Sequence, residues 1–299
     1  KKEPHYSRPR RKSRGELVQI DGSEHAWLEE RGPKATLLVF VDDATSEILA
    51  AEFVPEESFF SYGELCKRYF SEHGLPKSFY SDRFSVFRDN RKGNLSYEPV
   101  TQFQRVMTAL DIELICANSP QAKGRVERAN QTLQDRLIKE MRLLGICTYE
   151  QANRFLPEFI RDYNRRFAVI PAANLDYHRS LDKTQDLDFL FSIHDFRTIT
   201  NTLLIHYAGK VYQIATNHPA YYYAKQEVLI TCDHTGVVSA WFHGNLLTLI
   251  EVEKRPKQGS VISTKADKAD PLPPAYNHPW RTYGKKINGK PVLNTLSTE

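Results

Sequence analysis

The chain has 299 residues, of which 40% are hydrophobic, and this is enough to build the core of one large domain or of two. Its formal net charge is +4, and no apolar run approaches the roughly 20 residues of a membrane-spanning helix. No secretory signal is visible, and the four cysteines lack CxxC spacing. The composition therefore argues against a membrane protein, a disulfide framework and a zinc knuckle, and it favours a reducing compartment.

Positive charge is concentrated at the two ends of the chain. Residues 1–14 carry seven Lys or Arg against one acid, and residues 254–290 carry nine against two. Basic ends around a near-neutral middle fit contact with a phosphate backbone, and solvated tails are the alternative interpretation. The predicted DNA contacts in the first of these segments are Arg11, Lys12 and Arg14.

The first half of the chain alternates between strand and helix patterns. After a basic arm at 1–15, apolar runs predict strands at 17–21, 36–41 and 47–54, which form an antiparallel meander. The spacing then predicts, in order, a helix at 58–73, a strand at 77–81, a helix at 98–110 and a strand at 112–117. Ser119-Pro120 opens a long helix with an apolar stripe, and a second helix follows at 149–167.

This order of elements predicts an α/β fold in which a mixed five-stranded sheet carries helices on both faces. It is the ribonuclease-H-like arrangement, with the first strand central and the fourth beside it, and it defines a catalytic domain at 16–170. A linker at 171–199 comes next. Turn signals and β-branched residues then predict a small antiparallel β-barrel of about five strands at 200–253. Residues 254–299 are predicted to form a basic flexible tail.

Three segments each contribute one carboxylate to a predicted active site. Asp21 and Asp82 stand at the ends of apolar, β-prone runs, and Glu127 stands in the first turns of the long helix. Three acids at one point repel each other unless cations lie between them. Hard oxygen ligands suit Mg²⁺, and two such ions can activate a water or hydroxyl and stabilise the leaving oxygen of a phosphodiester.

Each acid also has a simpler interpretation. Asp21 could form a turn with the glycine that follows it, and Asp82 could cap the next segment. Glu127 could form an ordinary ion pair with the lysine four residues before it. A further acidic pair, Asp42 and Asp43, is interpreted as a turn former between two strands.

Polar and basic side chains surround Glu127 at the start of the long helix. A helix N-terminus with such side chains is suited to a phosphate backbone, and a solvated helix face is the alternative. The predicted DNA contacts in this segment are Lys123, Arg125, Arg128, Asn130 and Gln131.

Four short motifs follow one another along the first half of the chain. They are GELVQIDGS at 15–23, VDDATS at 41–46, YSDR at 80–83 and NSPQAKGRVER at 118–128. Together and in this order, they resemble the retroviral-integrase superfamily of DDE transposases, and within it the bacterial insertion-sequence transposases of the ISNCY type. The resemblance covers about residues 15–170, and the linker and barrel follow the family only in general pattern.

The resemblance implies a DNA transposase in which Asp21, Asp82 and Glu127 hold two Mg²⁺ ions, for which Mn²⁺ can substitute. One ion would activate water to cut the 3′ end of a mobile element, and the freed 3′-hydroxyl would attack target DNA. The implied partners are the terminal inverted repeats, target DNA and further copies of the chain in a DNA-assembled homo-oligomer, with no membrane. The implied location is the bacterial cytoplasm, in association with the nucleoid.

Forty-four residues separate Asp82 from Glu127, which is more than in retroviral integrases, and we expect the excess at 88–97. Members of the family usually carry an N-terminal helix-turn-helix region. None is visible, and the chain begins at Lys1, so we expect that sequence precedes it. Two other functions stay open at this point: a ribonuclease-H-like nuclease that only hydrolyses, and a catalytically inactive DNA-binding scaffold.

Overall fold

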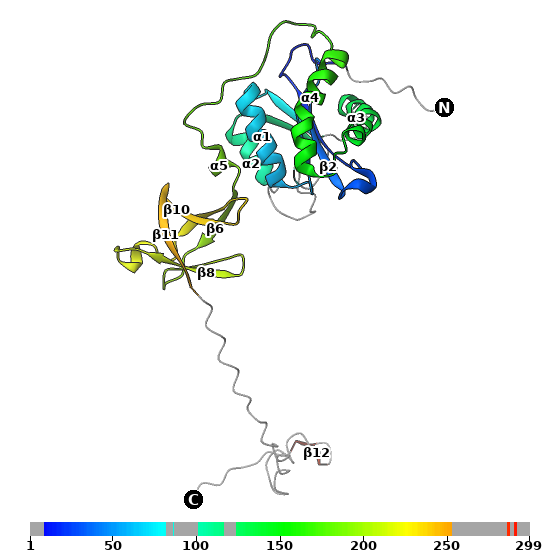
Figure 1. The fold of residues 1–299 in the computed structure, drawn as a ribbon. Helices are drawn as coiled ribbons and strands as arrows, with labels where there is room; N and C mark the ends of the chain where they lie inside the picture. Colours follow the sequence, from blue (N-terminus) through cyan, green and yellow to red (C-terminus); the bar gives the residue numbers. More distant parts are fainter. Residues whose placement is uncertain are drawn as a thin grey trace, which may run out of the picture. The chain divides into compact units, whose positions relative to one another are not determined.

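The computed structural model describes residues 9–81, 86, 101–116, 124–252, 286–287 and 290–291 (Figure 1). The chain forms two units, Lys1–Glu251 and Val252–Glu299. In the second unit, strands β12 (Lys286–Ile287) and β13 (Lys290–Pro291) pair antiparallel. Otherwise the predicted tail lies outside the described residues, as do residues 1–8 of the predicted arm and the predicted insertion at 88–97.

The first sheet has five strands in the order β3-β2-β1-β4-β5. The strands are β1 (Val18–His25), β2 (Ala35–Asp42), β3 (Ile48–Val54), β4 (Ser78–Ser81) and β5 (Glu113–Cys116). Strand β1 pairs antiparallel with β2 and parallel with β4, and β4 pairs parallel with β5. The predicted ribonuclease-H-like sheet, with the first strand central and the fourth beside it, is confirmed.

Strand β1 is longer than the predicted strand at 17–21. Its ladder with β2 continues past Asp21 through Gly22, which lies opposite Leu38, to His25. Every residue of β2 is buried, so this strand offers a continuous partner along its whole length. The interpretation of Asp21 as a turn residue is therefore wrong, because Asp21 lies within the central strand. A short 3-10 helix, η1 (Glu29–Arg31), follows β1.

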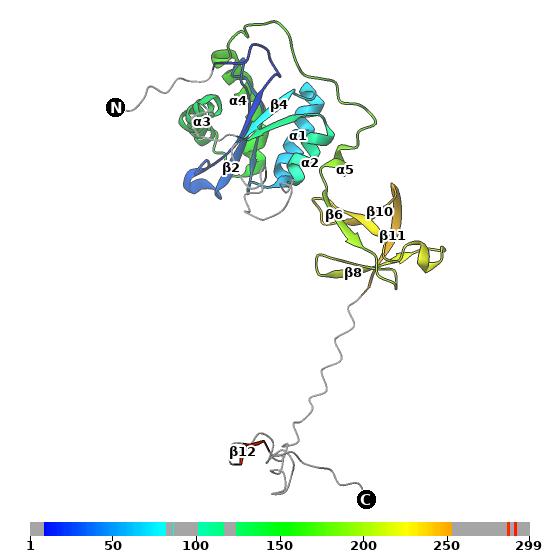
Figure 2. The ribbon, with the colours of Figure 1, turned by 180° about the vertical axis from the view of Figure 1, so that it is seen from behind.

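Helices cover both faces of the sheet (Figures 1 and 2). They are α1 (Phe59–His73), α2 (Gln102–Ala109), α3 (Gly124–Leu143) and α4 (Tyr149–Phe167). Helices α1 and α2 pack on one face in a core that contains Phe40, whereas α3 and α4 pack on the other face in a core that contains Val39. Successive residues of a strand point to opposite faces, so β2 contributes to both cores.

Hydroxyl caps set three of the helix starts. The side-chain oxygens of Ser58, Thr101 and Thr148 each accept a hydrogen bond from the backbone N–H three residues later. The predicted helices at 58–73 and 149–167 agree with α1 and α4. Residues 98–100 and the Ser119-Pro120 start of the long helix lie outside the described residues.

Side chains of α4 cover strand β3, which is one of the two edge strands of the sheet. The Asn164 amide accepts from the backbone N of Ile48 (2.8 Å) and donates to its carbonyl oxygen (2.9 Å). The Asn153 amide makes the same pair of bonds with Phe53, at 2.7 and 3.0 Å. The two amides therefore satisfy the backbone where a neighbouring strand would otherwise pair.

We expect Asn164→Ala to destabilise the fold by about 1–3 kcal/mol, because the N–H and C=O of Ile48 lose their partner. Asn164→Asp is the matched variant, since a carboxylate still accepts from the N–H but cannot donate to the carbonyl. Urea unfolding should rank the wild type above both variants. Equal midpoints for all three proteins would contradict the assigned role of this amide.

The predicted linker begins as a segment that is hydrogen-bonded to residues 12–14, next to the first sheet. Ala173 N donates to Lys12 O (2.8 Å) and Tyr177 N donates to Arg14 O (2.9 Å). Gly15 has φ +71°, and a Cβ there would lie 2.5 Å from Nδ1 of His178. Glycine is required at this position, because the backbone conformation and the close approach both exclude a side chain.

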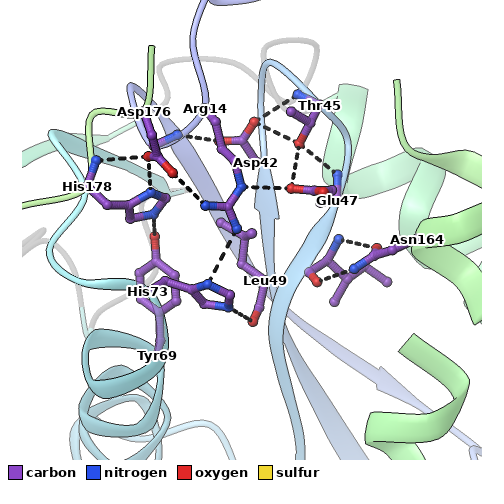
Figure 3. A network of polar contacts seen from close by, with 12 residues as sticks. Arg14, Asp42, Thr45, Glu47, Leu49, Tyr69, His73, Asn164, Asp176 and His178 are labelled. Carbon is purple, nitrogen blue, oxygen red and sulfur yellow. Dashed lines mark hydrogen bonds and ion pairs between the residues drawn. The ribbon is translucent and has the colours of Figure 1, made fainter. Parts of the chain in front are cut away.

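Arg14 ties the predicted arm to both the sheet and the predicted linker (Figure 3). Its guanidinium donates to Glu47 at 2.9 Å and to Asp176 at 2.8 Å. The Asp176 carboxylate also accepts from His178 Nδ1 (2.5 Å), whose Nε2 accepts from the buried hydroxyl of Tyr69 (2.6 Å). Residues 173–179 are therefore part of the same folded unit as the first sheet.

His73 lies beside this network in its neutral form. Its Nε2 donates to the Leu49 carbonyl (3.1 Å), which leaves Nδ1 to accept from Arg14 Nη2 (3.4 Å). Burial and the positive charge of Arg14 lower the pKa of His73 from its ordinary value of 6.5. Burial likewise lowers the pKa of His194.

We expect stability to fall as pH drops through about 6.5, because the unfolded chain binds protons at these histidines before the folded chain does. The loss ends once pH is below the lowered, folded-state pKa. His73→Gln should reduce the slope of melting temperature against pH in this window, with His194 causing the remainder. Replacement of the exposed His206 by Gln is the control, and an unchanged slope in His73→Gln would contradict the assignment.

The second sheet has six strands in the order β6-β9-β10-β11-β8-β7, with β6 close to β7, so it is nearly closed. The elements are α5 (Leu187–Leu190), β6 (Ile193–Thr198), β7 (Leu204–Tyr207), β8 (Lys210–Ala215), η3 (Ala220–Tyr222), β9 (Glu227–Cys232), β10 (Val238–Phe242) and β11 (Asn245–Val252). The sheet begins before the expected residue 200, because Ile193–Thr198 pairs with β9. The predicted small barrel is present with one more strand.

Within the described part of the chain, every helix is too short or too polar to cross a lipid bilayer.

Candidate active site

Helix α3 packs against the central strand through an apolar stripe with one polar member. The stripe includes Val126, Ala129, Leu133 and Leu137, all buried. Asn130 lies in the same face with 8% of its surface exposed, and its Nδ2 donates to Asp21 Oδ2 at 2.9 Å. The carboxylate can only accept, so this bond sets the orientation of the amide. Asp21, on β1, is partly exposed.

Glu127 is exposed and lies three residues before Asn130 on α3. Residues three apart are neighbours on a helix surface. The Asn130–Asp21 bond therefore brings the turn of α3 that carries Glu127 to the part of β1 that carries Asp21. Glu127 lies beside Val126, which is fully buried, so Glu127 is at the rim of the packed face.

Asp82, the third predicted acid, lies outside the described residues. The chain reaches it from β4, whose last residue, Ser81, is buried. Strand β4 pairs in parallel with β1, with Val18 opposite Phe79 and Gln19 opposite Tyr80. The strand that precedes Asp82 is thus the immediate neighbour of the strand that carries Asp21.

The oxygen atoms that Asp21, Glu127 and Asn130 offer are of the kind that bind a hard divalent cation. Asp21 and Glu127 offer carboxylate oxygens, and Oδ1 of the buried Asn130 has no hydrogen-bond partner among the described residues. Among those same residues no group of three His, Cys, Asp or Glu side chains is arranged to hold a metal ion. Two of the three predicted acidic ligands belong to the described part of the chain.

Four of the predicted DNA contacts are accessible on the surface. Arg128 and Gln131 are exposed on α3, and Lys12 is exposed on the arm. Arg11 is exposed as well, although its side chain is 3.5 Å from Glu16. Lys123 lies outside the described residues.

Three other predicted DNA contacts are engaged inside the fold. The Arg125 side chain is only 9% exposed, and its Nε lies 3.8 Å from Asp43 Oδ1. Asn130 is buried against Asp21, and Arg14 is occupied by Glu47 and Asp176. Sequence shows the charge or polarity of a side chain but not where it points, so it did not reveal these contacts within the protein.

The acidic pair at the end of β2 has two different roles. Asp42 forms the predicted turn, since its Oδ1 accepts from the N–H and the hydroxyl of Thr45 at 2.8 and 3.0 Å. Burial raises the pKa of Asp42, although these hydrogen bonds oppose the rise. Asp43 does more than form a turn, because its buried carboxylate also accepts from the side chain of Gln19 on β1 (2.7 Å).

The sequence analysis assigned no role to Gln19, and it assigned Asn130 to DNA instead of to Asp21. A signal was present for Asn130, which occupies a position of the apolar stripe four residues after Val126. A polar residue in a buried stripe requires a partner. Gln19, two residues before Asp21 on the same face of β1, carried only the weaker signal of an amide within a buried strand.

No family model matches the chain. Over 182 residues it is 53% identical to y4bF of Sinorhizobium fredii (strain NBRC 101917 / NGR234), a protein named as a transposase; the match covers 61% of this chain and 40% of that protein. Over 169 residues it is 40% identical to the transposase for insertion sequence IS1202 of Streptococcus pneumoniae, covering 56% of this chain and 36% of that protein. The chain thus spans less than half the length of these relatives.

Similar solved structures include the catalytic core domain of BIV integrase, with a TM-score of 0.38 and 20% identity over 52% of this chain and 88% of that one. Another is the trimeric form of the HTLV-2 integrase catalytic core in complex with magnesium, with a TM-score of 0.37 and 18% identity over 48% and 82% of the two chains. The sheet order defines a ribonuclease-H-like domain. Over the matched 182 and 169 residues, the chain is similar in sequence to the two transposases.

We expect Asn130→Asp to lower the melting temperature at neutral pH, because it places a second carboxylate beside Asp21. A loss of about 1 kcal/mol corresponds to roughly 2–4 °C for a protein of this size. Mg²⁺ should restore more stability to this variant than to Asn130→Ala, which loses the hydrogen bond without adding a charge. Equal effects of Mg²⁺ on the two variants would argue against a cation beside Asp21.

Proposed function

We propose that the protein is a DNA transposase that cuts the 3′ ends of a mobile element and joins them to target DNA. The observation that carries the proposal is the hydrogen bond from Asn130 to Asp21, which links the central strand to the helix turn beside Glu127. The sequence similarity to two transposases supports the same reaction class.

Asp21, Asp82 and Glu127 are the proposed catalytic acids. Asp21 is on the central strand, Asp82 follows the neighbouring parallel strand, and Glu127 is exposed on α3. Their oxygens are the ligands that we assign to two Mg²⁺ ions. When bound, such ions supply charge neutralisation and polarise the attacking and leaving oxygens of an in-line displacement.

The protein's own residues provide positioning for this chemistry. The hydrogen bond from Asn130 orients the Asp21 carboxylate, so that Oδ2 faces α3. Arg128 and Gln131 are exposed on the same helix, and we assign them to the phosphate backbone of bound DNA together with Lys12 and Arg11. Both displacements proceed without a covalent protein intermediate, so no Ser, Tyr or Cys nucleophile is required.

The proposed partners are the terminal inverted repeats of the element, target DNA and further copies of this chain. Each active site joins one 3′ end, so the joining of two ends requires at least two protomers. We therefore propose a homo-oligomer that assembles on DNA.

We expect Asp21→Asn and Glu127→Gln to reduce strand transfer by at least about 100-fold, because each removes an ionised ligand while preserving side-chain size. The assay uses element ends already cut to expose a 3′-hydroxyl, and it measures joined product with Mg²⁺ present. DNA binding, measured separately, should change little.

Glu158→Gln, on the exposed surface of α4, is the matched control and should join DNA at the wild-type rate. Wild-type protein that hydrolyses DNA but never joins the supplied ends would be a nuclease. Wild-type protein that binds the ends and does neither would be a DNA-binding scaffold. Either result would overturn the proposed function.

A further inference from the structure

Three polar contacts connect α3 to β1 at matched intervals. Val126 N donates to Gln19 Oε1 at 3.1 Å, and Asn130 Nδ2 donates to Asp21 Oδ2 at 2.9 Å. One step further along both elements, Gln134 Nε2 donates to Ser23 Oγ at 3.3 Å. The contacts use every second residue of the strand and every fourth residue of the helix. We refer to these three contacts as the α3–β1 ladder.

The spacing of the ladder follows from the geometry of the two elements. Two strand residues advance about 6.6 Å along the strand, and four helix residues advance about 6 Å along the helix axis. The two repeats are similar, so successive contacts stay aligned over three steps. A slip of the helix by one residue would shift it by about 1.5 Å and rotate it by about 100°. All three contacts would then be lost together, so the ladder defines one axial position of α3 on the strand.

Gln19 is the member of the ladder whose side-chain amide is hydrogen-bonded through both its oxygen and its nitrogen. Its side chain is completely buried. Its Oε1 accepts from Val126 N, so its Nε2 faces the other way and donates to Asp43 Oδ1 at 2.7 Å. The Gln19 amide therefore bridges the first described turn of α3 to the turn that follows β2.

Asp43 is in turn held by two other segments. It is fully buried, and its Oδ2 accepts from the backbone N of Arg11 at 2.8 Å. The Nε of Arg125 lies 3.8 Å from Asp43 Oδ1, with the Arg125 side chain only 9% exposed. The two residues that precede Glu127 are thus both held from the buried side of the helix, Arg125 by a carboxylate and Val126 by an amide.

We propose that Gln19 and Asp43 are positioning residues that set the place of Glu127 relative to Asp21. This inference rests on the proposed function, in which Glu127 and Asp21 are catalytic. Arg125 and Val126 immediately precede Glu127 in the helix. Arg125 faces Asp43, and the N–H of Val126 is bonded to Gln19. Neither Gln19 nor Asp43 reaches solvent, and both contact the first described turn of α3.

The chemistry of the bridge gives a specific test, because its donor and acceptor can be exchanged. Gln19→Glu keeps the acceptor for Val126 N but places two carboxylates in contact. In the double variant Gln19→Glu with Asp43→Asn, the amide introduced by the second substitution can donate to the new carboxylate, which still accepts from Val126 N. One negative charge is then retained beside Arg125.

The experiment measures single-turnover strand transfer on pre-cut ends, at saturating DNA, for the wild type, both single variants and the double variant. Gln19→Glu is expected to be at least about 10-fold slower, as is typical for residues that orient a metal ligand. The double variant is expected to return to within about threefold of the wild type. Asp43→Asn should be intermediate, because it keeps an acceptor for Gln19 but removes the charge that faces Arg125.

A second measurement does not depend on activity. Hydrogen exchange of the amides at the start of α3, measured without DNA, should accelerate in Gln19→Glu and slow again in the double variant. Asn164→Ala is the control for a general loss of stability, because it removes a half-buried amide contact far along the chain from this turn. It should lower the melting temperature without slowing strand transfer.

Two results would overturn the inference while leaving the proposed function intact. One is a folded Gln19→Glu variant that joins DNA at the wild-type rate. The other is a double variant that recovers the exchange protection of α3 but not the strand-transfer rate. If Gln19→Glu does not fold, the strand-transfer rate of the double variant is compared with that of Asp43→Asn. A double variant that is no faster than Asp43→Asn would overturn the inference. If the wild type itself does not join DNA, the proposed function is the one that fails.

Discussion

The site depends on a small number of hydrogen bonds that cross an otherwise apolar interface between α3 and β1. Apolar contacts in this interface supply most of the packing, but they are not directional and tolerate small shifts of a helix along a sheet. Hydrogen bonds to buried groups are directional, and a buried group that loses its partner is costly. Asn130, Gln19 and Gln134 therefore give α3 one position on the strand, and the position of Glu127 follows.

The same use of amide side chains occurs at strand β3, which α4 covers on the same face of the sheet as α3. Asn153 and Asn164 bond to both backbone groups of Phe53 and Ile48, and so complete the edge strand β3. Strand edges that lack such partners are open to pairing with other chains. Polar residues on α3 and α4 thus fix the strand against which each helix packs, β1 for α3 and β3 for α4.

Buried charge in this domain is compensated locally. Asp42 and Asp43 are both fully buried, and each accepts hydrogen bonds from backbone and side-chain donors. Arg125 lies 3.8 Å from Asp43, and Arg14 forms an ion pair with Glu47 in the turn that follows β2. The arm and the start of the predicted linker are held to the same turn by Arg14, so segments from both ends of the catalytic domain stabilise the region beneath α3.

The sequence alone was sufficient to predict the ribonuclease-H-like sheet and the helix limits at 58–73 and 149–167. These features depend on local patterns, namely apolar periodicity, hydroxyl caps and short motifs, and such patterns are readable along the chain. The length of β1, the first strand of the barrel at 193–198 and the burial of Arg125 were decided by partners distant in sequence. Only the tertiary structure showed that Asn130 faces Asp21, and that Gln19 and Asp43 lie beneath Glu127. The physical reason is that a hydrogen bond between a strand and a helix depends on their axial alignment, and no single segment encodes that alignment.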